Sequence, residues 1–261
     1  MIARGALGFL VACVVTAGAV RWGALRRDGA AAAIVVGTLC VAAGWSWAAL
    51  LLAFFVTSSA LSHIRAGSRE HRTGSIVVKS GARDALQVLA NGGVFALAAL
   101  LSIAVPWSGW MPLGAGALAA ATADTWGTEI GTLSTTAPRL ITSWRPVPAG
   151  TSGGVTPLGL AASAAGALLI ALLTWLLRWP AGAATAALAG GLAGALTDSL
   201  MGALLQAKRW CPLCDAGTER AVHGCGTVTE RAGGMSWLDN DGVNLLSGAA
   251  GALVALLVIL R

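Results

Sequence analysis

The chain has 261 residues, of which 56% are hydrophobic and 11% are charged, and its formal net charge is +6 at pH 7. So apolar a composition excludes an ordinary water-soluble globular domain and is typical of a polytopic membrane protein. The 35 glycines let neighbouring helices approach closely, and five cysteines are too few for a disulfide scaffold. We therefore expect one all-α integral membrane domain over residues 1–261.

Eight apolar runs are long enough to span or nearly span a bilayer, at residues 3–20, 29–44, 45–63, 84–105, 112–131, 157–178, 182–205 and 242–260. The sequence thus predicts a bundle of about eight transmembrane helices. The second run is short and interrupted by glycine, so six or seven spans are the alternatives. The first run follows a charged residue, as in a signal peptide, but further membrane segments follow it and we interpret it as the first span.

The basic residues predict the orientation of these spans. With the N-terminus outside, fourteen of the 17 Lys and Arg residues lie in the loops near 21–28, 64–83, 132–156 and 206–241. Cytoplasmic loops carry such an excess of positive charge. We therefore expect a multi-pass protein of the cell membrane with these four loops in the cytoplasm and both termini outside. No stripe of basic residues alternates with stacking aromatics, which argues against a nucleic-acid partner.

The fourth run begins with the stretch GARDALQVLANGG, which carries polar residues on one helical face. Asp84, Gln87 and Asn91 follow one another at helical spacing, and Lys79 and Arg83 lie just outside. Polar groups on one face of a membrane helix should point into the bundle. This end of the helix is therefore a candidate binding surface.

The fifth run ends in ATADTWGTEIG, which places two carboxylates where a membrane helix normally has none. An intramembrane carboxylate is costly, so Asp124 is expected to face a cavity or an ion, with a structural hydrogen bond as the alternative. Asp124 and Glu129 are about 140° apart on a regular helix and need not bind the same ion. Thr125 and Glu129 share a face.

The seventh run repeats this arrangement. Gly190-x3-Gly194-x3-Asp198-Ser199 matches Gly116-x3-Ala120-x3-Asp124-Thr125. In both helices small residues precede an Asp that is followed by a hydroxyl. The match predicts a duplicated helix pair with a site at the repeat interface. Chance is the alternative in a chain so rich in Ala and Gly.

Two further polar stretches stand at predicted helix starts. The loop PAGTSGGVTPLG precedes the sixth run with Thr151, Ser152, Gly153 and Gly154, whose backbone amides can cradle phosphate, although the P-loop pattern is absent. The stretch WLDNDGVN precedes the last run with Asp239, Asn240, Asp241 and Asn244. Asp239 or Asn240 alone fits an N-cap. Together with Asp124, Glu129 and Asp198, these oxygen ligands suit Mg²⁺.

The loop at 206–241 contains a second candidate metal site. Cys211, Cys214, His223 and Cys225 follow the pattern C-x2-C-x8-H-x-C. Four such ligands in a reducing compartment suit a tetrahedral structural Zn²⁺. Reduced thiols without a metal are the alternative.

In combination, these motifs resemble a family of integral membrane proteins that includes transmembrane protein 19 and the phytyl-phosphate kinases of plants and cyanobacteria (domain of unknown function 92). The resemblance is carried by RDALQVLANGG, ATADTWGTEIG, PRLIT with VPAGTSGGVT, TDSLMGALLQ, and HGCGTVT followed by WLDNDGVN, and runs across nearly the whole chain. It implies transfer of a phosphoryl group from a nucleoside triphosphate to a polyprenyl monophosphate.

The polar residues suit that reaction, because phosphoryl transfer needs positioning and charge neutralisation. In this interpretation Asp124, Asp198 and Asp241 hold Mg²⁺, Glu129 holds a second ion or orients the acceptor, and Lys79, Arg83 and Arg139 hold phosphates. A transporter or channel for a lipid phosphate or ion is the main alternative, since intramembrane carboxylates and a repeat suit it as well. A zinc-stabilised membrane scaffold would leave the buried Asp residues unexplained.

Overall fold

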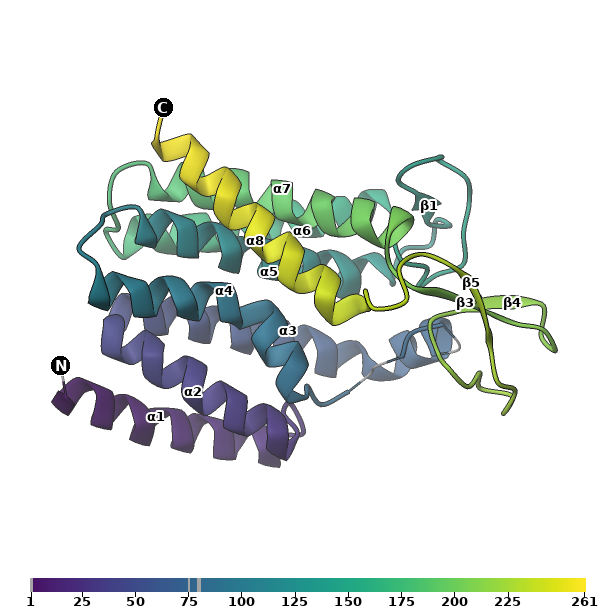
Figure 1. Ribbon diagram of the computed structural model, residues 1–261, viewed down its shortest axis with the longest axis horizontal. Coiled ribbons are helices and arrows are strands. Elements are labelled where there is room, and N and C mark those ends of the chain that lie inside the picture. Colours follow the sequence, from purple (N-terminus) through teal and green to yellow (C-terminus); the bar gives the residue numbers. More distant parts are fainter. Residues whose placement is uncertain (1, 75, 79–80) are drawn as a thin grey trace.

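The computed structural model describes residues 2–74, 76–78 and 81–261. Within these ranges the chain forms eight helices, which confirms the expected all-helical bundle (Figure 1). They are α1 (Ile2–Arg21), α2 (Arg27–Ala43), α3 (Trp45–Thr73), α4 (Ala85–Ala104), α5 (Trp110–Gly131), α6 (Pro157–Leu176), α7 (Ala183–Leu204) and α8 (Asn240–Ile259).

Six of these helices are long and apolar enough to cross a membrane, namely α1, α3, α4, α6, α7 and α8. The other two differ for separate reasons. Helix α2 has only 17 residues, and α5 combines small residues with polar ones towards its C-terminal end. Helix α5 does not need an apolar surface, because most of its first half is buried among other helices. The span count by composition therefore matches the lower of the predicted values.

Helix α5 forms the centre of the bundle and packs against α3, α4, α6, α7 and α8. Its small residues make this possible. A Cβ atom added to Gly251 of α8 would lie 2.8 Å from Ala120 Cβ and from the carbonyl oxygens of Gly116 and Gly190. Backbones of α5, α7 and α8 therefore touch directly, as small-residue packing between membrane helices allows.

The predicted repeat positions of α5 and α7 lie against each other. A Cβ atom added to Gly190 would lie 2.9 Å from Gly116 Cα, and one added to Gly194 would overlap Ala120. Equivalent positions thus meet in register along the two helices. This pairing is what two copies of one helix related by a twofold axis would produce, and it brings the ends of both motifs to one place.

A second part of the core is aromatic and lies further along the bundle. The Trp47 ring contacts Phe95 and Trp179, with ring centroids 5.0 and 4.8 Å apart. All three side chains are buried. Such tilted aromatic pairs add stability beyond the area that they bury, so α3 and α4 are fixed to the α6–α7 turn.

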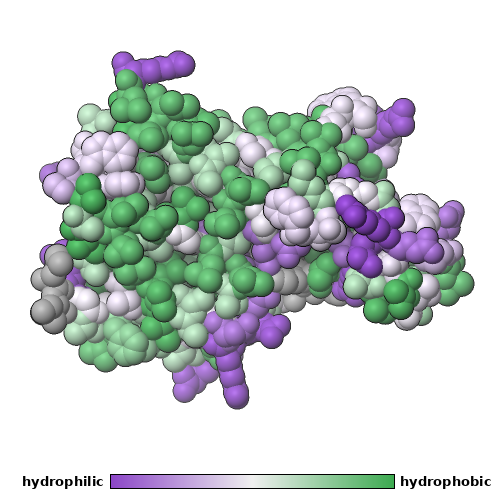
Figure 2. Space-filling view, in the orientation of Figure 1, coloured by the Kyte–Doolittle hydropathy of each residue, from purple (hydrophilic) through white to green (hydrophobic). Residues whose placement is uncertain are grey.

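Short strands complete the fold at one end of the bundle. β1 (Arg139–Leu140) pairs antiparallel with β2 (Gly154–Val155), and β3 (Lys208–Cys211) pairs antiparallel with both β4 (Ala216–Thr218) and β5 (Glu230–Gly233). Both chain termini lie at the opposite end (Figure 1). Figure 2 shows a hydrophobic surface over much of the helical body, with hydrophilic side chains gathered mainly around the strand end. The predicted loops at 132–156 and 206–241 thus contain small sheets.

Candidate functional site

A cavity of about 540 Å³ opens at the strand end of the bundle. Its walls come from α3, α4, α5, α6, α7 and α8 and from the segments that contain Val77, Ser152 and Glu219. Most of the polar residues singled out in the sequence line it. They are Arg83, Gln87, Asn91, Asp124, Thr125, Glu129, Thr151, Ser152, Gly153, Gly154, Asp198, Ser199, Asp239, Asn240, Asp241 and Asn244.

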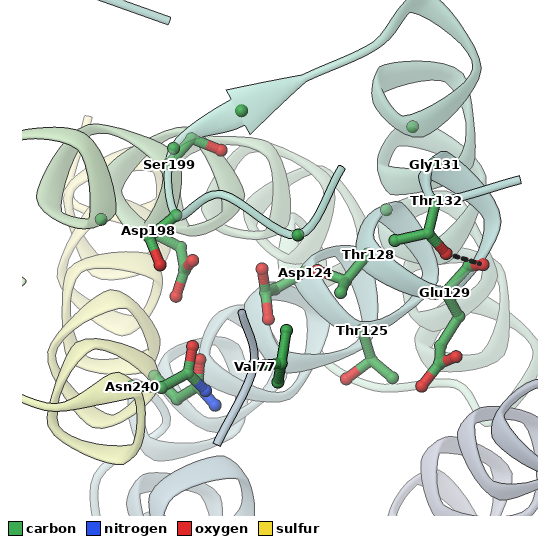
Figure 3. A pocket seen from close by; sticks show the side chains of 18 of the residues that line it. Val77, Asp124, Thr125, Thr128, Glu129, Gly131, Thr132, Asp198, Ser199 and Asn240 are labelled. Atoms are coloured by element: carbon green, nitrogen blue, oxygen red, sulfur yellow. Dashed lines mark hydrogen bonds between the residues drawn. The ribbon is translucent and has the colours of Figure 1, made fainter. Parts of the chain in front are cut away.

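Two carboxylates from the repeated motifs face each other inside this cavity. Figure 3 shows Asp124 of α5 and Asp198 of α7 pointing towards one another, and the two side chains interact directly. The Oδ2 atom of Asp198 is buried and has no hydrogen-bond partner in the described part of the chain. Two buried like charges at close range repel each other, so the pair calls for a proton or a cation between them.

Glu129 lies away from this pair, as its position on the helix predicts (Figure 3). Its side chain is only 4% exposed. Ser62 Oγ of α3 donates a hydrogen bond to Glu129 Oε1 at 2.7 Å. Glu129 therefore connects α3 to the central helix at the other side of the cavity from Asp198.

The start of α8 brings one capping residue and one buried carboxylate to the cavity. Asp239 is the N-cap, and its Oδ1 accepts a hydrogen bond from Gly242 N at 3.0 Å. Asp241, in the first turn, is 8% exposed. The N-cap alternative is therefore correct for Asp239, which also lines the cavity together with Asn240, Asp241 and Asn244.

The start of α4 also has an acidic N-cap, followed by residues that line the cavity. Asp84 is the N-cap and forms a capping box with Gln87, in which each side chain binds the other residue's backbone amide. Asp84 does not line the cavity, whereas Gln87 and Asn91 do. Arg83 also lines the cavity, and its Nη1 donates to Ser59 Oγ at 3.0 Å.

The glycine-containing loop before α6 is held tightly against α7. Gly153 has φ of +78° and lies so close to Ala203 that a side chain would overlap it, while a Cβ on Gly202 would lie 3.0 Å from Gly153 N. Thr156 caps α6 by accepting a hydrogen bond from Gly159 N at 3.0 Å. The loop backbone therefore approaches the cavity at a helix N-terminus, an arrangement suited to anions.

Glu219 is a cavity residue that the sequence analysis did not single out. It follows β4, and its carboxylate accepts hydrogen bonds from Ser152 Oγ and, at 2.9 Å, from Gln206 Nε2. Burial is the main cause that raises the pKa of Glu219 above its usual value. In the sequence it stood among charged loop residues, without an apolar run to mark it as buried.

The same hairpin holds a segment beside the cavity. Glu219 N donates to Ile76 O at 3.0 Å, and Arg220 Nε donates to Val77 O at 2.8 Å. Val77 lines the cavity near Asp124 (Figure 3). The sheet of β3, β4 and β5 therefore fixes both an acidic group and a wall of the site.

The charge of the cavity is unbalanced. Six acidic side chains line it in the described ranges, namely Asp124, Glu129, Asp198, Glu219, Asp239 and Asp241, against one basic side chain, Arg83. Of the other two predicted phosphate ligands, Lys79 lies outside the described residues. Arg139 is exposed on β1, where its Nη1 donates to Trp144 O at 2.8 Å, and it does not line the cavity.

The predicted thiol and imidazole ligands gather beside β3. The ligand atoms of Cys211, Cys214, His223 and Cys225 all lie within 4.8 Å of one another, so these residues can hold a metal ion. Contacts from Thr227 and from His223 lower the pKa of Cys225 to about 5. A hydrogen bond with Cys225 is the first cause that raises the pKa of Cys214 to about 11. Within the cluster, Cys225 is therefore the residue that favours the thiolate, the form that binds metals.

A family model described as integral membrane protein DUF92 matches residues 10–252. The chain belongs to this family. The Arabidopsis thaliana protein named Protein PGR is 32% identical to this chain over 252 residues, which cover 85% of each chain.

Two uncharacterized membrane proteins are also similar to this DUF92 chain. MJ0933 of Methanocaldococcus jannaschii is 32% identical over 168 residues, covering 64% of this chain and 68% of the relative. The protein sll0875 of Synechocystis is 35% identical over 144 residues, covering 53% and 55%. No solved structure matches the chain. Membership establishes that the chain is an integral membrane protein.

Proposed function

We propose that this DUF92 protein is a membrane-embedded kinase that transfers a phosphoryl group from a nucleoside triphosphate to a polyprenyl monophosphate, such as phytyl or geranylgeranyl phosphate. The observation that carries the proposal is the single cavity that gathers six carboxylates, an arginine and a glycine-containing loop at one end of an apolar bundle. A lipid phosphate can reach such a cavity from the bilayer and a nucleotide from water.

The donor set suits Mg²⁺. The ion prefers oxygen ligands and is often bound by one or two carboxylates, with water and phosphate oxygens in the other positions. Asp124 and Asp198 provide such a pair, and the buried Asp198 Oδ2 lacks a hydrogen-bond partner among the described residues. In this proposal these two residues hold the ion, and Asp241 adds a third carboxylate from α8. Bound Mg²⁺ neutralises phosphate charge and aligns the reacting groups.

The chain's own residues position the two substrates. These residues all line the cavity. In this proposal the backbone of Thr151–Gly154 and the N-terminus of α8, with Asn240 and Asn244, would bind the nucleotide phosphates, and Arg83, Gln87 and Asn91 would bind the acceptor phosphate. An oxygen of the acceptor phosphate attacks the γ-phosphorus, and the bond from that phosphorus to the nucleoside diphosphate breaks. No covalent bond to the protein is needed. Glu129 remains available to hold a second ion or to orient the acceptor.

We further propose that the Cys211, Cys214, His223 and Cys225 cluster binds a structural Zn²⁺. Three thiols and one imidazole form a closed tetrahedral set, which is typical of structural zinc sites. The ion would tie β3 to the turn that contains His223 and Cys225. Because Glu219 follows β4 in the same sheet, zinc would keep that carboxylate in the cavity.

A kinase explains the site better than a transporter does. The polar lining is confined to one end of the bundle, whereas the first half of α5 is buried among Gly and Ala contacts with α7 and α8. Alternating access would need polar groups towards both ends. In this proposal the strand end faces the cytoplasm of a cell-membrane protein, where nucleoside triphosphates are available.

The proposal is tested with purified protein in nanodiscs, Mg²⁺, geranylgeranyl phosphate and ATP, CTP, GTP or UTP in separate reactions. Mass spectrometry should detect geranylgeranyl diphosphate with at least one nucleotide. Asp124→Asn and Asp198→Asn should abolish most of this product, whereas Asp28→Asn, a half-exposed Asp outside the cavity, should not. Absence of diphosphate with every nucleotide and with phytyl phosphate would overturn the proposal.

A further inference from the structure

A second cavity of about 120 Å³ lies between α1, α2, α3 and α4. We call it the α1–α4 groove. Most of its lining is aliphatic or aromatic, contributed for example by Val15, Val36, Leu51, Phe55 and Val88. An apolar cavity of this kind offers water few hydrogen-bond partners and is suited to hydrocarbon.

The polar lining of the α1–α4 groove is concentrated at one boundary. Arg83, Gln87 and Asn91 line both this groove and the acidic cavity described above. Thr16 also lines the groove, but its hydroxyl donates to Ala12 O at 2.7 Å within its own helix. The two cavities therefore meet at three polar side chains, with carboxylates on one side and hydrocarbon on the other.

Arg83 is fixed at this boundary by its backbone as well as by its side chain. Arg83 N donates to Ala24 O at 3.0 Å, and Arg26 N donates to Arg83 O at 2.9 Å. Gly29 packs directly on the Arg83 carbonyl, where a side chain would overlap it. The loop between α1 and α2 thus holds Arg83 in place. The position of Arg83 then defines where an anionic group can bind between the acidic cavity and the α1–α4 groove.

The α1–α4 groove also opens towards the membrane. Helix α1 packs along α2 and has few contacts with α3 in the described residues, apart from one end, where Trp22 just after α1 stacks on His63 of α3. Val11, Val15 and Leu52 line the groove and are each more than one third exposed. In a bilayer these side chains face lipid, and a chain can enter the groove sideways.

We propose that the α1–α4 groove binds the prenyl chain of the lipid-phosphate substrate, with its phosphate held by Arg83 at the boundary. This inference rests on the proposed kinase function and adds to it the path of the hydrocarbon chain. The occupant follows from continuity, because an amphiphile with an anionic head and an apolar tail matches both sides of the boundary. The part of the chain nearest the phosphate lies in the groove, and the remainder extends into the bilayer.

The groove can be filled from within by larger side chains. Ala33 of α2 and Ala48 of α3 line it, whereas their neighbours Ala31 and Ala49 are exposed and do not. Ala33→Leu and Ala48→Leu should lower kcat/KM for geranylgeranyl phosphate by about tenfold or more, the scale of a few displaced carbon atoms in an apolar pocket. Ala31→Leu and Ala49→Leu make the same change at exposed positions outside the groove, and their kcat/KM should stay near the wild-type value.

A binding measurement tests the groove without turnover. A geranylgeranyl phosphate analogue with a diazirine on its second isoprene unit is photolysed in nanodiscs with wild-type protein. Cross-links should map to α1–α4 groove residues, should be suppressed by excess geranylgeranyl phosphate, and should be weakened in Ala33→Leu and Ala48→Leu. Phosphatidic acid, which carries a phosphate but no prenyl chain, should not compete in equal excess when the nanodisc bilayer is made without it.

The two proposals fail in different ways. If no diphosphate forms but the cross-links map to the groove, the kinase function fails while the groove still binds the lipid phosphate. If diphosphate forms, the groove inference is overturned by cross-links confined to other helices, by equal competition from phosphatidic acid, or by groove variants that match their controls. Melting temperatures within a few degrees of wild type identify the variants that are folded.

Discussion

Asp198 of α7 faces Asp124 of α5, and four residues earlier Gly194 of α7 lies against Ala120 of α5. The close contact of the small residues is what brings the two carboxylates together. Helices that approach this closely leave no room for side chains between them. The contact between Gly194 and Ala120 therefore positions the acidic pair. Separate substitutions can test the packing of the small residues and the role of the two carboxylates.

The acidic pair should be required for metal binding and not for folding. In Asp198→Asn, binding of Mn²⁺, a paramagnetic substitute for Mg²⁺, should weaken strongly by electron paramagnetic resonance titration, and turnover should fall by about two orders of magnitude. The melting temperature should hold or rise, because the substitution removes repulsion with Asp124. Unchanged Mn²⁺ affinity would contradict the assignment of Asp198 as a ligand.

The small-residue contact should be sensitive to a single methyl group. In Gly251→Ala the new Cβ would lie 2.8 Å from Ala120 Cβ and from two carbonyl oxygens, so we expect a loss of about 1–3 kcal/mol and a lower melting temperature. Gly248→Ala is the matched control on α8, since no atom outside the neighbouring backbone of its own helix lies within 4 Å of its added Cβ. That variant should melt at or above the wild-type temperature. Equal effects at both positions would contradict the packing argument.

The cysteine cluster should contain one zinc ion per chain. Elemental analysis of purified protein should find about one zinc, and Cys211→Ala combined with Cys214→Ala should remove it. Cys13→Ala, a cysteine of α1 outside the cluster, should keep the full content. Zinc retained in the double variant would refute this site.

Stability should depend on pH through Glu219. Burial raises the pKa of Glu219 in the folded protein above the value of about 4 in the unfolded chain. As pH rises, the unfolded chain therefore loses this proton before the folded protein does. The free energy of unfolding of the wild type falls across the pH range between the two pKa values. Glu219→Gln keeps an acceptor for Ser152 and Gln206 but has no charge to bury. Its melting temperature relative to wild type, measured without divalent ions, should therefore increase with pH across this range. A constant or declining difference would show that burial of the charge is not the cause.

Orientation can be tested from the two ends of the bundle. Thr136 is exposed in the loop just before β1, and Ser108 is exposed in the short turn before α5. An impermeant maleimide applied to intact cells should label Ser108→Cys and not Thr136→Cys. The exposed native Cys214 and Cys225 should also stay unlabelled if the strand end is cytoplasmic. Labelling of Thr136→Cys from outside would reverse the orientation.

Much of the bundle could be predicted because hydrophobicity governs it. The helix limits follow the apolar runs to within a few residues for most helices, and polar groups such as Asp124 and Asp198 were conspicuous because a bilayer tolerates few of them. Helix α3 is the exception, since it continues to Thr73, ten residues beyond the predicted end, where hydropathy no longer marks the helix.

How these residues assemble into one site could not be predicted from the sequence, because it depends on contacts between distant segments. Asp84 and Asp239 are helix caps, which a motif of spaced acidic residues cannot separate from a proposed metal ligand such as Asp241. Glu219 gave no signal, because its burial depends on contacts with Ser152 and Gln206 from distant segments. Arg139 carried a suitable charge, but β1 places it outside the cavity lining. The two- to four-residue strands are likewise set by packing rather than by propensity.

Transfer of a phosphoryl group to a lipid phosphate in this cavity can be measured directly. The most direct measurement uses a nucleoside triphosphate labelled in its γ-phosphate, Mg²⁺ and geranylgeranyl monophosphate with protein in nanodiscs. We predict that the label appears in geranylgeranyl diphosphate, at a level that falls about a hundredfold in Asp198→Asn. Label released only as inorganic phosphate, or equal labelling of the lipid by Asp198→Asn, would contradict the account.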